Sequence, residues 1–316
     1  TLFEIVRSLD TTISKIKNLE DDILSSLSNL NARLIIPIPG KDAIGIEVPN
    51  NKPNIVSFKE ILEKNEIKES KDSRSFKTPI GKNGENKTFN LDLQYPTYIA
   101  GNTGQGKSIL MNTILSATLL KNNSSEVKFV LIDTKKDDFS QYNKLNKDYI
   151  AFKNEDGSNV ISNIENSIDI LKKLGEEMDN RYDLLVESNS REIGEYNNKI
   201  RTGELKDKEV LPKIILAIDE INDLMLVAGK DFEIPLAKLA QLSRATGIHI
   251  VIATQRPSIN NLTGIIKANF PNKIGTKVFS RIDSRTILDG SGAEALIGKG
   301  DILLNQNGEL SRIQSA

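Results

Sequence analysis

The sequence predicts an α/β fold, in which a parallel β-sheet is flanked by helices, and three observations indicate this class. From residue 95 onward, short apolar segments alternate with segments of helical periodicity. The first four apolar segments carry hydrophobic residues at nearly every position, as strands buried on both faces do. A glycine-rich loop joins the first of them to a helical segment. The predicted strands are residues 97–101, 128–134, 213–220, 247–254, 273–279 and 300–305.

The N-terminal part of the chain predicts a separate, small α+β module over residues 1–50. Apolar residues recur every three or four positions over 11–30, which is the spacing of an amphipathic helix. Residues 33–50 follow with Pro-Gly punctuation and the alternating segment AIGIEV, which predict a short hairpin. Residues 51–93 are polar and rich in lysine, and we expect a connector that partly folds onto its neighbour.

Helices are predicted between the strands of the larger region, residues 94–316. Residues 108–120 follow the glycine-rich loop directly and have a helical pattern. Residues 160–182 place apolar side chains on one stripe, from Ile161 to Met178. A third helix is predicted over 233–247, with Gly247 at its end. Such alternation of strand and helix favours parallel crossover connections.

Composition excludes several classes of site. Lys and Arg number 42 against 43 Asp and Glu, so any nucleic acid must be bound by local charges rather than by a global positive field. With no cysteine and one histidine, His249, the chain cannot form disulfides or a thiolate or histidine metal cluster by itself. It lacks a run of about 18 apolar residues and a signal-peptide pattern, so we expect a soluble, cytoplasmic protein. We expect any membrane anchor only in a longer parent chain.

The loop after the first predicted strand, GNTGQGKS, matches the phosphate-binding pattern G-x-x-x-x-G-K-[ST]. Glycines allow backbone N–H groups to surround a triphosphate at a helix N-terminus. Lys107 supplies a positive charge to the outer phosphates, and the Ser108 hydroxyl suits Mg²⁺. An ordinary glycine turn is the alternative, which the complete match and its flanking elements disfavour. The predicted nucleotide-binding residues are Gly101, Asn102, Thr103, Gly104, Gln105, Gly106, Lys107, Ser108 and Ile109.

Two adjacent carboxylates, Asp219 and Glu220, end the apolar segment KIILAIDE. Carboxylates at the end of a buried strand are costly unless a cation lies beside them. With a phosphate loop upstream, we expect Asp219 to hold the coordination sphere of Mg²⁺ and Glu220 to polarise the attacking water. A surface pair at a sheet edge is the alternative. Gln255 follows the segment 247–254 and is predicted to sense the γ-phosphate or to orient water, with a plain capping side chain as its alternative.

These segments resemble the motor region of the FtsK/SpoIIIE family of hexameric double-stranded DNA translocases, over nearly the whole chain. PIPGKDAIGIEVPN is similar to the segment that closes the family's α domain, and GNTGQGKS and IILAIDEINDLM are similar to its Walker A and Walker B motifs. LAQLSRATGIHIVIATQRPS, TGIIKANFPNKI and SRIDSRTILDGSGAEALIGKGDILL resemble its signature runs, as do the weaker EEMDNRYDLL and EIGEYNNKI. The resemblance implies ATP and Mg²⁺ as cofactors.

The resemblance also implies a domain organisation. Residues 1–50 correspond to a partial α domain, which stacks as a second ring in the family, and residues 94–316 to a RecA-like β domain that carries the ATPase. Nothing corresponds to the family's winged-helix γ domain, so directional control by this chain alone is not expected. The sequence departs from the family after the second core strand, where Thr134 replaces a proline.

Four basic residues acquire roles from the resemblance alone. Arg244, in LSRATG, matches an arginine finger that reaches the γ-phosphate of a neighbouring subunit, whereas the residue by itself favours a cation that complements a helix C-terminus. Arg281 lies where the family often has a second trans-acting basic residue, commonly lysine. Arg256 and Lys267 fall in the stretch that grips the DNA backbone, with solvated surface charges as the alternative.

The implied function is an ATP-driven motor that assembles as a homo-hexameric ring and threads double-stranded DNA through its pore, in chromosome or plasmid transport. Because Arg244 and Arg281 complete the site across the interface, the monomer is expected to be nearly inactive. A conjugative coupling or secretion ATPase, which moves single-stranded DNA or protein, is one alternative. A nucleotide-regulated scaffold without useful turnover is another, and the presence of Glu220 and Gln255 argues against it.

Overall fold

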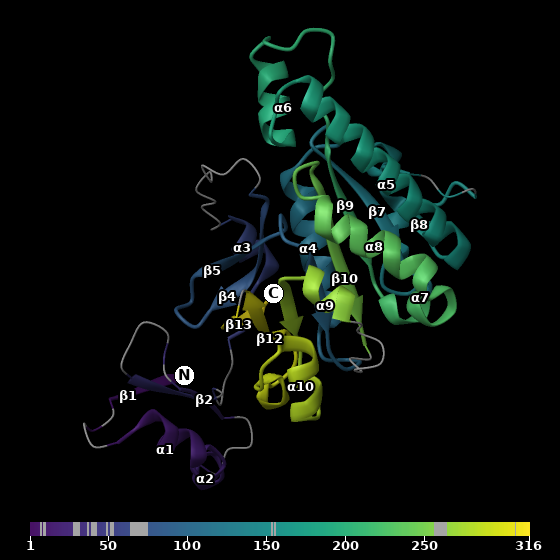
Figure 1. Ribbon diagram of the computed structural model, residues 1–316. Coiled ribbons are helices and arrows are strands. Elements are labelled where there is room, and N and C mark those ends of the chain that lie inside the picture. The colour runs from purple at the N-terminus through teal and green to yellow at the C-terminus, as the bar shows by residue number, and fades with distance from the viewer. Residues whose placement is uncertain are drawn as a thin grey trace.

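Two β-sheets organise the chain, a three-stranded sheet near the N-terminus and a ten-stranded sheet that carries most of the remaining elements (Figure 1). The computed structural model describes residues 1–6, 8, 11–27, 32–36, 38, 43–48, 50, 54–63, 75–152, 154, 156–255, 264–306 and 308–316. In that part of the chain, the helices fall short of the length and apolar character that crossing a membrane requires.

The large sheet is mixed. Its strands lie in the order β5-β4-β13-β12-β11-β6-β10-β9-β7-β8, and pairing is parallel from β11 to β8. It is antiparallel from β11 to β5. The strands are β4 (Lys77–Asn83), β5 (Thr88–Asp92), β6 (Thr97–Ala100), β7 (Val127–Ile132), β8 (Val160–Ile161), β9 (Lys213–Ile218), β10 (Ile248–Thr254), β11 (Asn272–Gly275), β12 (Asp301–Gln306) and β13 (Glu309–Ser315).

This topology confirms the α/β class and changes one detail. The segment 300–305 was expected to continue the parallel sheet, but β12 runs antiparallel to β11. β12 begins at the same edge of the sheet at which β11 ends, so the chain runs back through the sheet in the opposite direction. Residues 77–92, which fall in the predicted connector, form β4 and β5 of the large sheet.

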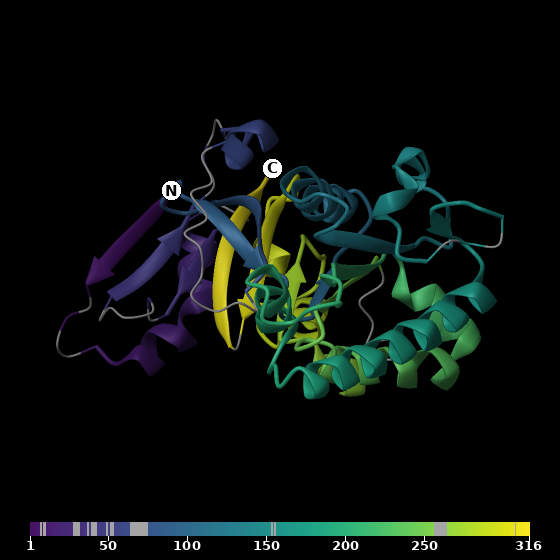
Figure 2. The ribbon, with the colours of Figure 1, turned by 90° about the horizontal axis from the view of Figure 1, so that it is seen from above.

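Helices cover both faces of the large sheet, as Figure 2 shows from above. Alternate residues of β9 belong to different cores: Ile215 packs in the core that includes α4, and Leu216 in the core that includes α5 and α8. The helices are α3 (Phe58–Glu63), α4 (Lys107–Lys121), α5 (Ile164–Glu187), α6 (Ile193–Arg201), α7 (Ile221–Ala228), α8 (Lys230–Leu242), α9 (Gly264–Asn269) and α10 (Arg281–Leu288), with 3-10 turns at Ser140–Lys144, Lys147–Tyr149 and Ala293–Ala295.

The long helix α5 illustrates how local sequence sets an element. It begins at Ile164, later than predicted, because β8 occupies residues 160–161 and Asn163 then caps the helix by accepting from the backbone of Glu165 and Asn166. Leu171, Leu174 and Met178 of the predicted apolar stripe are fully enclosed, and Ile164 and Ile168 are partly buried against the same core. Ile161, the first residue of the predicted stripe, lies in β8 instead.

The N-terminal module contains a three-stranded antiparallel sheet in the order β1-β3-β2. The predicted hairpin is confirmed by pairing of β2 (Arg33–Ile35) with β3 (Ala43–Glu47), and β1 (Leu2–Val6) adds the other edge. The predicted single helix is broken at Leu19 into α1 (Ile13–Asn18) and α2 (Glu20–Ser26), neither of which has a buried residue. The module lies beside β12 and β13, where Arg312 contacts Glu47 at 3.1 Å (Figure 2).

Candidate nucleotide-binding site

The loop between β6 and α4 has a backbone that only glycine accommodates at two positions. A side-chain carbon at Gly101 would lie 1.8 Å from the hydroxyl oxygen of Thr276. Gly106 has a φ of 104° and caps α4, which starts at Lys107. The chain therefore turns tightly from a buried strand into a 15-residue helix, and the backbone N–H groups of the first turn remain available to an anion.

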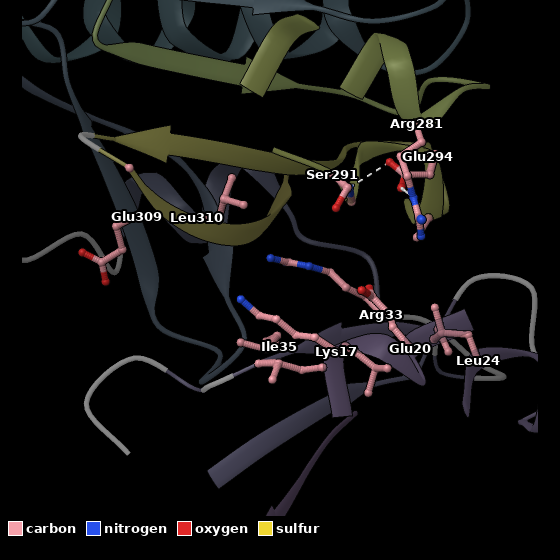
Figure 3. A pocket seen from close by; sticks show the side chains of 16 residues that line it. Lys17, Glu20, Leu24, Arg33, Ile35, Arg281, Ser291, Glu294, Glu309 and Leu310 are labelled. Atoms are coloured by element: carbon pink, nitrogen blue, oxygen red, sulfur yellow. Dashed lines mark hydrogen bonds and ion pairs between the residues drawn. The ribbon is translucent and has the colours of Figure 1, made fainter. Parts of the chain in front are cut away.

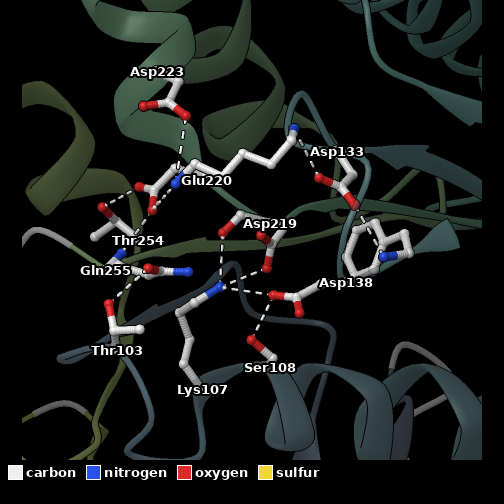
Figure 4. A network of polar contacts seen from close by, with 12 residues as sticks. Thr103, Lys107, Ser108, Asp133, Asp138, Asp219, Glu220, Asp223, Thr254 and Gln255 are labelled. Atoms are coloured by element: carbon white, nitrogen blue, oxygen red, sulfur yellow. Dashed lines mark hydrogen bonds and ion pairs between the residues drawn. The ribbon is translucent and has the colours of Figure 1, made fainter.

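Lys107 lies at the centre of a polar network (Figure 4). Its Nζ donates to Oδ1 of Asp219 at 2.5 Å and to the Asp219 carbonyl oxygen at 3.1 Å, and the Lys107 side chain is 3% exposed. It also lies 3.6 Å from Oδ2 of Asp138, which accepts a short hydrogen bond from the Ser108 hydroxyl. The structure thus brings together the predicted residues Lys107, Ser108 and Asp219.

The two carboxylates of this network have opposite pKa shifts. Burial raises the pKa of Asp219 to about 7, although the Lys107 ammonium acts in the other direction. Burial also opposes ionisation of Asp138, but hydrogen bonds from Ser108 and Asp219 and the charge of Lys107 lower the pKa of that carboxyl. Additional positive charge at this site would therefore favour the ionised form of the buried Asp219 carboxyl.

Glu220 is oriented by the neighbouring strand. Its Oε1 accepts from the Thr254 hydroxyl at 2.5 Å, and its Oε2 accepts from the backbone N–H of Gln255 at 3.0 Å. Lys135 Nζ lies 3.4 Å from the same Oε2. With 3% of Glu220 exposed, its carboxylate is held by groups from β10 and from the loop after β7.

Gln255 connects this carboxylate to the glycine-rich loop. Its Oε1 accepts from the Thr103 hydroxyl at 2.9 Å, so β10 ends against the phosphate-loop side of the site (Figure 4). Gln255 thus contacts the loop through its side chain and Glu220 through its backbone N–H, which is the placement expected of a residue that senses an anion bound in the loop.

Sequence reasoning missed Asp138 and Lys135, which lie in the loop after β7. The loop is shaped by Asp133, whose carboxylate accepts from the backbone N–H groups of Lys135, Lys136 and Phe139. The signal was present in IDTKKDDF, because charged residues directly after a buried parallel strand lie at the same sheet edge as those after its neighbours.

The donors at this edge suit a nucleotide phosphate with a hard cation. The buried Nδ2 of Asn102, in the glycine-rich loop, has no hydrogen-bond partner within the described ranges and is a donor available to an anion. The Ser108 hydroxyl and the carboxylates of Asp138 and Asp219 are oxygen ligands of the kind that Mg²⁺ prefers, and Mg²⁺ takes its other ligands from water and phosphate.

Arg244 lies at the opposite edge of the sheet. It precedes β10, whereas Gln255 follows it, and the two ends of this seven-residue strand are about 20 Å apart. Its guanidinium contacts Gln94 and Tyr95, just before β6. The structure does not bring Arg244 to Lys107 of the same chain.

Arg281 and Lys267 contact acidic side chains other than those beside Lys107. Arg281 pairs with Glu294 and, across to the N-terminal module, with Asp21, each at 3.3 Å. It lines a pocket whose facing wall includes Lys17 and Arg33 (Figure 3). Lys267, on α9, lies 3.4 Å from Asp289. Arg256 falls outside the described residues.

Comparisons with known proteins match both parts of the chain. Residues 58–259 match the model of the FtsK/SpoIIIE family, and residues 1–50 match that of the FtsK alpha domain. The chain is 41% identical over 319 residues to the DNA translocase FtsK of Chlorobaculum tepidum, covering 99% of this chain and 38% of that protein. It is 41% identical over 308 residues to the DNA translocase SftA of Bacillus subtilis, covering 98% and 31%.

Two solved structures of other proteins share the fold. The pCW3 conjugation coupling protein TcpA, in a monomer form with ATPγS, has a TM-score of 0.63 and 25% identity, covering 99% of this chain and 84% of that one. The cytoplasmic domain of the type VII secretion ATPase EccC of Thermomonospora curvata has a TM-score of 0.63 and 25% identity, covering 76% and 28%.

Proposed function

Because the chain belongs to the FtsK/SpoIIIE family, we propose that it is the ATP-hydrolysing motor of a cytoplasmic double-stranded DNA translocase. The chain spans only 38% of the first relative described above, so the activity of the whole protein is inferred from its motor region. Chromosome or plasmid transport is the cellular role that we propose.

One observation carries the proposal. Lys107 of the phosphate loop and the two carboxylates that follow β9 lie at one sheet edge. The Nζ atom of Lys107 is 2.5 Å from Asp219, and Glu220 is held by Thr254 of β10. In a parallel sheet, this edge is where ligands bind. A lysine that binds phosphate and a fixed carboxylate that accepts a proton from water are the groups that phosphoanhydride hydrolysis needs.

We assign the roles within the chain as follows. The loop N–H groups and Lys107 bind the triphosphate, and Ser108 and Asp219 are the ligands that we propose for Mg²⁺. When bound, Mg²⁺ neutralises charge that develops on the phosphates. Glu220 takes a proton from the attacking water, and Gln255 orients that water or senses the γ-phosphate.

We propose that Arg244 completes this site from a neighbouring subunit. Its distance from the carboxyl edge, about 20 Å along β10, prevents the side chain from reaching phosphates in its own chain. A homo-hexameric ring would therefore be required for turnover. Arg281 is proposed as a second trans-acting residue, which must first exchange its contacts with Asp21 and Glu294.

Duplex DNA is proposed to pass through the ring along Arg256 and Lys267. A ring repeats each residue in every subunit, so a few charges for each chain suffice for a phosphate track although the net charge is −1. Lys267 and Lys273 both pair with Asp289, so this group of three side chains keeps a net positive charge.

The proposed domains are a partial α domain over 1–50, a connector over 51–93 and the motor over 94–316. Within the connector, β4 docks on the motor by pairing with β13. The helix α3 is joined to β4 by the ion pair of Glu60 with Lys82 at 2.8 Å.

A second function is a coupling or secretion ATPase that moves single-stranded DNA or polypeptide. The observation that favours it is the likeness to TcpA and EccC, at 25% identity each. It shares the proposed nucleotide site and differs only in the transported polymer.

ATP hydrolysis at micromolar protein tests these proposals, measured without DNA, with long single strands and with long linear duplex. Stimulation by duplex that fades with salt supports the translocase. The variant Glu220→Ala should lose turnover, whereas Asp223→Ala, which removes another carboxylate near Lys135, should keep most of it. Stimulation by single strands only would favour the coupling function, and no turnover under any condition would leave a nucleotide-binding scaffold.

A further inference from the structure

Arg244 is held by two uncharged side chains, which we call the clamp: Gln94 and Tyr95. The Nε and Nη2 atoms of Arg244 donate to Oε1 of Gln94 at 3.2 and 2.6 Å. The guanidinium carbon lies 4.6 Å from the centroid of the Tyr95 ring, a distance at which an aromatic face attracts a cation. A long, flexible side chain is thereby confined to one conformation.

Gln94 of the clamp is held in place by contacts within its own chain. Gln94 is 5% exposed, and its Nε2 donates to Oδ2 of Asp92 at 2.7 Å. Asp92 also accepts from the Ser75 hydroxyl at 3.0 Å and from the Phe76 N–H at 2.9 Å. Because the amide nitrogen is committed to a carboxylate, the amide oxygen of Gln94 faces Arg244.

The clamp does not cancel the charge of Arg244. Two other arginines of the chain pair with carboxylates: Arg181 Nε lies 2.7 Å from Glu177 Oε1, and Arg312 Nη2 lies 2.6 Å from Asp301 Oδ2. Within the residues that the structure describes, no carboxylate oxygen lies within 4.0 Å of the Arg244 guanidinium. An amide oxygen and a ring face orient the cation and leave its full charge for an anion outside the chain.

We infer that Gln94 and Tyr95 are positioning residues, which present Arg244 to the nucleotide phosphate bound by a neighbouring subunit. This inference rests on the proposed function, in which Arg244 acts across the interface. Holding the side chain in advance removes the entropy cost of ordering it during each contact. Keeping the charge uncompensated lets the phosphate receive the whole electrostatic interaction.

A mixture of two inactive variants tests whether Arg244 acts on the nucleotide of a neighbouring subunit. Arg244→Ala chains have an intact phosphate loop, and Lys107→Ala chains have an intact arginine. In an equimolar mixture, about a quarter of the interfaces pair an intact loop with an intact arginine, so duplex-stimulated hydrolysis should reappear if Arg244 acts in trans. No recovery by the mixture would overturn the trans role of Arg244, and with it the positioning role of the clamp.

The positioning role is tested by placing Gln94→Glu on one chain of the mixture at a time. On the Lys107→Ala chain, which donates the arginine, the new carboxylate should neutralise Arg244 and reduce recovered hydrolysis about 10- to 100-fold. On the Arg244→Ala chain, which receives the arginine, the same substitution should leave recovery unchanged. A defect of folding or assembly would reduce recovery in both placements.

Two further donor-chain variants separate charge from shape. Gln94→Met introduces no charge but removes the acceptor, and should give a smaller loss that is again confined to the donor chain. Tyr95→Phe keeps the ring face and loses only the long hydrogen bond of 3.5 Å from Arg244 Nη2 to the Tyr95 hydroxyl. It should therefore retain more recovered hydrolysis on the donor chain than Tyr95→Leu, which removes the ring face. Recovery that is insensitive to Gln94→Glu on the donor, or equally sensitive on both chains, would overturn the inference while leaving the proposed function standing.

Discussion

Thr254 donates its hydroxyl hydrogen to Oε1 of Glu220 over 2.5 Å, so the last residue of β10 orients the carboxylate that follows β9. Both side chains are buried, with 3% of each residue exposed. The two strands are adjacent and parallel, with Ile252 paired to Ile218. The orientation of the proposed water-activating group is therefore a property of the rigid sheet rather than of a loop.

Thr254→Val should reduce the rate of ATP hydrolysis about tenfold with little change in nucleotide affinity, because it removes a hydrogen bond to a charged group. The threonine and valine side chains have similar shapes, so packing is kept. Thr254→Ser retains the hydroxyl and should keep most of the activity. Steady-state rates and nucleotide titrations of both variants check this; equal rates for Val and Ser would contradict an orienting role.

Lys107→Met should destabilise the nucleotide-free protein by about 3 kcal/mol, because it leaves the buried Asp219 without its cation. The double variant Lys107→Met/Asp219→Asn should recover much of this loss. Lys121→Met, at the exposed end of the same helix, should change stability by less than about 0.5 kcal/mol. Urea unfolding of the wild type, Lys107→Met, Asp219→Asn and the double variant gives the coupling free energy between the two side chains, and strict additivity would show that they act independently.

His249 should make the protein sensitive to acid. It is 2% exposed and lies with its ring centroid 5.1 Å from that of Phe76, and burial, with a contribution from the charge of Lys213, lowers its pKa to about 3. The unfolded chain takes up a proton near pH 6.5, so stability is complete above that pH and is lost as pH falls toward 3.

The variant His249→Leu isolates this contribution. Between pH 7.5 and pH 5.0, the wild type should lose about 2 kcal/mol more stability than the variant. Urea unfolding midpoints at the two pH values provide the measurement. Parallel losses in both proteins would mean that His249 does not stay neutral on folding.

Gly175→Ala should stabilise the protein by about 0.5–1 kcal/mol. Gly175 lies inside α5, and an added side-chain carbon there meets nothing within 4 Å. Gly101→Ala should instead be severely destabilising, because its added carbon would overlap the hydroxyl of Thr276. Thermal unfolding compares the two, and a decrease in stability for Gly175→Ala would contradict the expectation.

The sequence predicted those features of the fold that depend on local pattern. The central strands and α4, α5 and α8 are predicted because hydrophobic periodicity is read within a short window. The proximity of Lys107, Ser108 and Asp219 is predicted because the loop motif and the strand end occur together, whereas the chemical roles of these residues and of Glu220 stay predictions. Strand β13 was missed because residues 309–315 alternate polar and apolar side chains only weakly.

Contacts between distant segments could not be predicted from local pattern. The charged segment after β7 indicates the sheet edge at which Asp138 lies, but its contact with Ser108 depends on the path of the loop, which the sequence pattern does not specify. Likewise, the pairing of Arg281 with Asp21 joins segments 260 residues apart. The contact of Arg244 with Gln94 depends on the strand order, in which β6 lies beside β10.

The position of β13 has a consequence for how the chain folds. This strand lies between β12 and β4, so among the strands that the structure describes it alone joins the β4–β5 pair to the rest of the sheet order. Ser315 pairs with Gly81, a closure across more than two hundred residues of chain. Because such long-range closure is entropically costly and slow, the β4–β5 pair must wait, with one edge unpaired, until the ribosome has released residues 309–315. The strands that carry the nucleotide site do not need this pairing, so they can assemble before β13 joins the β4–β5 pair to the sheet.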